Sequence, residues 1–140
     1  MVLFGTDHRH TFEGYRYLTA HLGLLAAAHV GPEWRDRLHF VHAKASVRHE
    51  KLQGFDDKLF ETLADTLYDK DEGADSFTFS LDEDFAPHRS WVIYHDSSFL
   101  DGDFLLEPDT FDSPILMAVF GDFIQSSIRV LEEADERRIK

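Results

Sequence analysis

Histidine and carboxylate residues form two incomplete metal-binding patterns. His39 and His42 lie three residues apart with Asp36 three before them, so on a helix all three would share one face. His8 and His10 form a second close pair. Cationic neighbours oppose an ion at the first set, and short pairs like the second are common in a chain with nine histidines. We expect no bound transition metal.

Two other patterns approach known motifs and then depart from them. His49-Glu50 begins the zinc-peptidase pattern His-Glu-x-x-His, but Gln53 stands where the second histidine is needed. Aspartates around Gly73 resemble a calcium loop, yet an EF-hand with Gly73 sixth would need a glutamate where Phe79 stands. The sequence holds no serine-hydrolase elbow, dinucleotide fingerprint or phosphate loop. We therefore expect no enzyme activity, no catalytic residue and no cofactor.

The strongest chemical signal in the sequence is electrostatic. Residues 65–112 hold 14 acidic and 2 basic groups, whereas residues 1–64 are balanced and residues 113–140 carry a net charge of −1. A concentrated negative field attracts cationic partners, and the aromatic residues between these charges could anchor an interface. The predicted partner-binding residues are Asp69, Asp71, Glu72, Asp75, Asp82, Glu83, Asp84, Asp96, Asp101 and Asp103. The alternative is that the charge serves solubility alone.

Length and composition limit the class of protein. A chain of 140 residues with 43 % hydrophobic residues predicts one globular domain over residues 1–140. The absence of cysteine excludes disulfides and cysteine-based zinc sites. No signal-peptide start and no unbroken apolar run of spanning length are present, which predicts a cytoplasmic protein that does not enter the membrane. The net charge of −13 argues against direct binding of nucleic acid.

Apolar spacing predicts the helices that would position these groups. Residues 12–28 follow Thr11 as an N-cap, and residues 55–68 repeat apolar side chains every four positions. A last helix begins at Ser113-Pro114. Helical spacing also favours a helix from Pro32 to Gly54, with a strand over 38–47 as the alternative.

The apolar period changes from 3.6 to 2 after residue 73, which predicts strands within residues 75–107. Apolar and polar residues alternate over 76–81, residues 91–94 are rich in strand formers, and Asp101-Gly102 favours a hairpin turn. Met1–Phe4 is a further short strand candidate. The predicted fold is α+β, with N-terminal helices, a small antiparallel β-meander and a C-terminal helix packed on the sheet.

These features predict a small acidic binding protein that occludes a basic protein partner. In size and charge the chain is similar in a general way to immunity proteins, which implies an inhibitor that neutralises a nuclease-type toxin. An acidic secretion or assembly chaperone is the first alternative, and a small His-dependent metalloenzyme is the second. Homodimerisation is compatible with the sequence.

Overall fold

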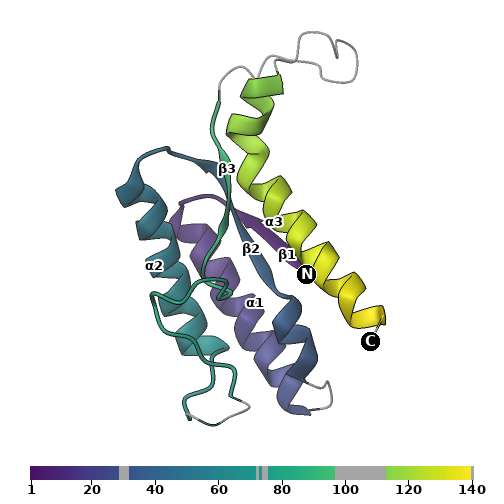
Figure 1. Ribbon diagram of the computed structural model, residues 1–140. Helices are drawn as coiled ribbons and strands as arrows, with labels where there is room; N and C mark the ends of the chain where they lie inside the picture. The colour runs from purple at the N-terminus through teal and green to yellow at the C-terminus, as the bar shows by residue number, and fades with distance from the viewer. Residues whose placement is uncertain (29–31, 72, 74–75, 97–112, 140) are drawn as a thin grey trace.

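Three parallel strands form the centre of the structure (Figure 1). The computed structural model describes residues 1–28, 32–71, 73, 76–96 and 113–139. The strands lie side by side in chain order: β1 (Val2–Gly5), β2 (His39–Ala45) and β3 (Trp91–Tyr94). Because all three run the same way, their amino ends share one edge of the sheet and their carboxyl ends share the other.

Helices cover both faces of this sheet (Figure 1). α1 (Arg9–Ala28) and α2 (His49–Thr66) pack together on one face, and α3 (Ser113–Ile139) lies on the other. A short 3-10 helix, η1 (Pro32–Arg37), leads from α1 into β2. Parallel neighbours need crossover connections, and right-handed crossovers that step in one direction across a sheet place their helices on one face. α1 lies in the connection from β1 to β2 and α2 in the connection from β2 to β3, and both helices lie on one face of the sheet as this rule requires.

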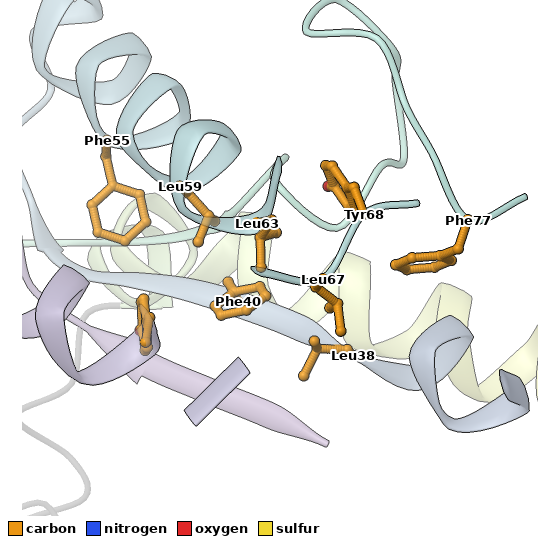
Figure 2. Packing of buried hydrophobic residues seen from close by; sticks show 9 residues of the cluster. Leu38, Phe40, Phe55, Leu59, Leu63, Leu67, Tyr68 and Phe77 are labelled. Atoms are coloured by element: carbon orange, nitrogen blue, oxygen red, sulfur yellow. The ribbon is translucent and has the colours of Figure 1, made fainter. Parts of the chain in front are cut away.

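The main core lies between β2 and α2 (Figure 2). Phe40 on β2 packs with Phe55, Leu59 and Leu63 on α2, and none of these four side chains is more than 1 % exposed. The apolar residues that repeat along α2 therefore form the buried helix face that the sequence predicted. Tyr15 on α1 joins this core, with its ring edge-on to Phe40 at 5.0 Å.

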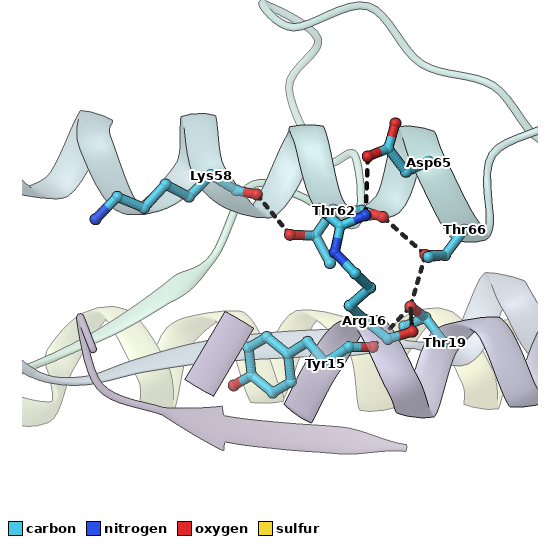
Figure 3. A network of polar contacts seen from close by, with 7 residues as sticks. All are labelled: Tyr15, Arg16, Thr19, Lys58, Thr62, Asp65 and Thr66. Carbon is cyan, nitrogen blue, oxygen red and sulfur yellow. Dashed lines mark hydrogen bonds and ion pairs between the residues drawn. The ribbon is translucent and has the colours of Figure 1, made fainter. Parts of the chain in front are cut away.

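Hydroxyl groups join α1 to α2 on the same side of the sheet (Figure 3). The Thr19 and Thr66 hydroxyl oxygens lie 2.6 Å apart, so one of them donates to the other. Each hydroxyl also lies 2.7 Å from a carbonyl of its own helix, Tyr15 for Thr19 and Thr62 for Thr66. A Cβ on Gly23 would meet the Thr66 carbonyl at 3.2 Å, so glycine permits this close helix approach.

The prediction of an antiparallel meander is wrong, since all described strand pairs are parallel. Phe77, Phe79 and Leu81 alternate with polar residues but form no strand. Phe77 and Phe79 instead lie in the loop between α2 and β3, where both rings pack against Tyr68. A loop laid across a core also alternates buried and exposed side chains. The Asp101-Gly102 hairpin prediction falls outside the described residues.

The predicted helix from Pro32 to Gly54 is also wrong over its centre, where β2 runs. β2 is covered on both faces, because His39 faces α3 while Phe40 and His42 face α1 and α2. A strand buried on both faces shows no alternation of polar and apolar residues. Its apolar residues therefore matched a helical spacing by coincidence, and the weaker strand alternative was correct.

The other elements agree with the sequence more closely. Helices over 12–28, over 55–68 and from Ser113 onward are confirmed, although α1 begins at Arg9 and α2 at His49. Strands at the N-terminus and over 91–94 are confirmed as β1 and β3. α2 begins without a side-chain cap at Arg48, so its start carried no capping signal in the sequence.

Candidate partner-binding cleft

A cleft of about 520 Å³ opens between α3 and the loop that joins α2 to β3. β2 and β3 begin at its floor, where the rings of His39 and Trp91 stack with centroids 4.7 Å apart. α3 forms one wall with Arg129 and Glu133. The loop forms the opposite wall and includes Phe85. The cleft thus lies at the amino-terminal edge of the sheet.

The loop wall is fixed by a fully buried histidine. His88 Nδ1 lies 2.8 Å from the Tyr68 hydroxyl, and His88 Nε2 lies 3.1 Å from the Leu81 carbonyl oxygen. Since a carbonyl only accepts, Nε2 carries the proton and the Tyr68 hydroxyl donates to Nδ1. Burial lowers the pKa of His88 from its ordinary 6.5. The neutral His88 ring therefore accepts a hydrogen bond at Nδ1 and donates one at Nε2, and these two bonds fix the loop wall.

Two carboxylates tie the loop to neighbouring elements. Asp56 on α2 accepts hydrogen bonds from the Ser90 hydroxyl at 2.5 Å and the Ser90 N–H at 3.2 Å. Burial raises the pKa of Asp56, and these hydrogen bonds partly oppose that rise. Asp69 accepts from the Phe77 N–H at 2.7 Å and from Arg35 Nη1 at 3.0 Å. Those two bonds hold the pKa of Asp69 below its usual value.

Two arginines that line the cleft have buried, unpaired N–H groups. The Nε atoms of Arg35 and Arg89 are both buried and have no hydrogen-bond partner among the described residues. The Arg35 side chain is only 14 % exposed, and its guanidinium carbon lies 4.8 Å from the centre of the Phe77 ring. A buried N–H without an acceptor costs about 1–3 kcal/mol. Because both Nε atoms are buried, an acceptor on a ligand reaches them only when the neighbouring side chains move.

Carboxylates line the cleft together with four arginines. Asp36, Asp84 and Glu133 line it and are exposed. Glu133 is 4.0 Å from Arg137 on the same helix, whereas Asp84 lies in an exposed acidic turn. The next residue, Phe85, is 75 % exposed with a φ of 63°, a conformation that bulky residues rarely adopt. The turn thus presents an aromatic ring beside its carboxylates.

The structure brings only part of the predicted acidic set together. Asp82, Glu83 and Asp84 form one exposed turn, and the Glu83 carboxylate accepts from the Ser80 N–H at 3.1 Å. Asp69 and Asp71 follow α2, and Asp69 is engaged with Arg35. Asp96 lies at the other end of the sheet, just past the carboxyl end of β3. The remaining four predictions lie outside the described residues: Glu72, Asp75, Asp101 and Asp103.

The histidine patterns are separated by the fold. His39 and His42 lie on β2 rather than on a helix, and they face opposite sides of the sheet. His39 stacks on Trp91, whereas His42 stacks on Phe55 at 4.0 Å. Within the described residues, no three histidine, aspartate or glutamate side chains lie together so that they could hold a metal ion. The expected lack of metal stays a prediction for elemental analysis.

Sequence reasoning missed the arginines of the cleft. Arg35 reaches it from η1, Arg89 from the loop and Arg129 from α3. Arg89 offered a weak signal, because it is one of only two basic residues in the acidic stretch 65–112. Arg129 offered none, because the position of its guanidinium 4.4 Å from the centre of the Phe85 ring depends on a long-range contact.

α3 shows a further property. By length and composition it could cross a membrane, with a mean hydropathy of 1.3 over its best window, and only 11 % of that window is buried. In the structure α3 instead packs on β3, where an Asp122 carboxylate oxygen accepts from the Val92 N–H at 2.7 Å. The Phe123 ring lies 6.1 Å from the ring of Trp91. The predicted absence from membranes stays a prediction.

Comparisons of the chain with protein-family models, with curated proteins and with solved structures found no match.

Proposed function

We propose that this chain binds a basic protein partner through the cleft and acts as an inhibitor that occludes the partner's basic surface. The observation that carries the proposal is that exposed carboxylates and two arginines with buried, unpaired Nε–H groups line the same cleft. Neither group alone selects a partner. Together they fit a polypeptide segment that carries cationic side chains on a backbone rich in carbonyl acceptors.

Each part of the cleft suits one part of such a segment. Lysine or arginine side chains of the partner pair with Asp84 and Glu133, forming charge-assisted hydrogen bonds. Main-chain carbonyls of the same segment accept from the Nε–H groups of Arg35 and Arg89 once these buried side chains shift toward the cleft. The exposed Phe85 ring adds apolar contact area, as aromatic anchors do at interfaces.

A polypeptide fits the cleft better than a free anion does. Arg35 is already paired with Asp69 at 3.0 Å, and Arg137 lies 4.0 Å from Glu133, so much of the local positive charge is compensated. The chain's net charge of −13 repels anions from a distance. A carbonyl is a neutral acceptor, so it meets the unpaired N–H groups without this repulsion.

Peptide titration tests the proposal. The probe is a short, unstructured peptide of lysine, arginine and valine, labelled with a fluorophore and titrated with the protein. Replacing Asp84→Lys and Glu133→Lys together should weaken binding by at least about tenfold, or about 1.4 kcal/mol. The melting temperature should change little, because exposed carboxylates contribute little to stability.

A matched control separates the cleft from general charge attraction. Glu61→Lys with Asp65→Lys makes the same charge change on exposed positions of α2, across the sheet from α3. This control should bind the peptide nearly as well as the wild-type chain. Equal losses in both variants, or tighter binding of inorganic phosphate than of the peptide, would refute the proposal.

A further inference from the structure

His88 holds the turn of residues 81–88 in place from inside the protein. Its side chain is fully buried and packs edge-on against the Phe60 ring of α2, with ring centroids 4.9 Å apart. Both ring nitrogens are used, since Nδ1 accepts from the Tyr68 hydroxyl and Nε2 donates to the Leu81 carbonyl. The second bond closes the turn, because it joins a side chain to the backbone seven residues earlier.

The charged form of this ring does not fit the same site. A protonated imidazole donates at both nitrogens, so the Tyr68 hydroxyl would have to rotate and accept from Nδ1. The hydroxyl proton would then lose its acceptor in a buried site, which is unfavourable. The ring would also carry a charge where water is excluded. Protonation is therefore favoured only when the ring leaves this site.

The charged groups that face His88 do not compensate for its burial. Glu83 in the turn and Asp57 on α2 favour the charged ring, whereas Arg89 opposes it. Burial is the largest effect, and it holds the pKa of His88 below its ordinary 6.5. An exposed ring regains its ordinary pKa, so a fall in pH shifts the equilibrium toward the form in which the ring is exposed.

Other bonds tie the two ends of the loop. Asp69 accepts from the Phe77 N–H at 2.7 Å, and its lowered pKa keeps it charged in mildly acidic solution. At the other end, Asp56 on α2 accepts from the Ser90 hydroxyl. Loss of the His88 bonds should therefore release the turn between these ends rather than the whole loop.

We propose that protonation of His88 is a switch that releases the turn of residues 81–88 and so opens the loop wall of the cleft. The turn carries Asp84 and Phe85, which line the cleft. It is held against backbone strain, because Phe85 has a φ of 63°. Ala86 is only 2 % exposed and becomes accessible when the turn is released. Since the exposed ring titrates near 6.5, the population of the open form should rise about tenfold from about pH 7.5 to about pH 5.5.

Thiol labelling measures this opening. The chain has no cysteine, so Ala86→Cys places a single buried thiol within the turn. Val47→Cys, beyond β2 at a position 80 % exposed, gives the reactivity of an accessible thiol at each pH. The labelling rate at residue 86 divided by the rate at residue 47 should rise about tenfold from about pH 7.5 to about pH 5.5. A ratio that does not rise overturns the proposal.

Three further variants separate the switch from unfolding of the whole chain. Ala45→Cys places a thiol in β2, where the native side chain is 1 % exposed, and it should label more slowly than residue 86 at both pH values. Adding His88→Gln to Ala86→Cys should remove the pH dependence, because glutamine does not titrate. Adding His42→Gln, which removes another buried histidine, should leave it unchanged. Equal rates at residues 45 and 86, or the same pH dependence with His88→Gln, would overturn the proposal.

Nuclear magnetic resonance of ¹⁵N-labelled histidine tests the switch in the wild-type chain. At about pH 7.5 the His88 ring should carry its single proton on Nε2, and a ring that is charged or protonated on Nδ1 would overturn the proposal.

Coupling of the switch to the partner rests on the proposed function. The basic peptide should slow labelling at residue 86 at about pH 5.5, because it binds the closed turn. Bound peptide that leaves this rate unchanged would overturn the coupling. Labelling is first measured without peptide, so a chain that labels as expected but binds no peptide refutes the proposed function alone.

Discussion

Three histidines lie in environments that disfavour their charged form. The pKa values of His39, His42 and His88 are all lowered from 6.5, and burial is the largest cause for each. His39 stacks on Trp91, His42 stacks on Phe55, and His88 is held between Tyr68 and a carbonyl. These contacts place the three rings in the packing of the sheet and in the cleft wall.

The stability of the protein should decrease in mildly acidic solution. Because these histidines have lower pKa values in the folded chain, the unfolded chain binds more protons just below pH 6.5. The free energy of unfolding should therefore fall as pH drops through about 6.5, and it should be fully retained above that value. Asp56 has a raised pKa because of burial, so its protonation favours the folded chain and opposes this trend. Melting temperatures at about pH 7.5 and about pH 5.5 measure the effect, and a higher melting temperature at the lower pH would contradict it.

At the scale of elements, the sequence predicted those that bury one face and failed where both faces are buried. α2 has a single apolar face, so its four-residue repeat predicted the contacts of Phe55, Leu59 and Leu63 correctly. β2 is covered on both sides, so its apolar spacing held no period of two. The alternation over 76–81 came from a loop that packs on Tyr68. A regular spacing of apolar residues indicates which side chains are buried. It indicates a β-strand only where a neighbouring strand is present to pair with that segment.

Glycine substitutions test how closely β1 and α1 pack. A Cβ at Gly5 would overlap the Tyr15 hydroxyl and the Thr11 methyl group. Gly5→Ala should therefore lower the free energy of unfolding by about 1–3 kcal/mol or more. A Cβ at Gly14, within α1, would meet nothing within 4 Å. Gly14→Ala should stabilise the chain by about 0.5–1 kcal/mol through helix propensity. Urea denaturation of both variants measures these changes, and equal effects of one sign would show that β1 and α1 are not packed as described.

At the scale of the whole molecule, α3 forms one wall of the cleft, which carboxylates and arginines line together. The acidic stretch of the sequence predicts a basic partner, and this stays a prediction. It could not predict the cleft, because Arg35, Arg89 and Arg129 come together only through the parallel fold.

Salt should weaken binding of the basic peptide to the cleft. Raising ionic strength from about 0.1 M to about 1 M shortens the Debye length from about 10 Å to about 3 Å. Binding of the basic peptide should weaken by more than about tenfold over this range, because carboxylates carry it. Fluorescence anisotropy of the labelled peptide measures the affinity, and binding that does not change with salt would contradict a role for the carboxylates.

The unpaired arginine groups allow the most direct test of the proposed function. Nuclear magnetic resonance of ¹⁵N-labelled protein can observe the Nε–H signals of Arg35 and Arg89, assigned with Arg35→Lys and Arg89→Lys variants. If the cleft binds the basic peptide as proposed, both signals should shift downfield and exchange more slowly with water on titration, because each N–H gains a carbonyl acceptor. Peptide binding that leaves both signals unchanged would contradict the account.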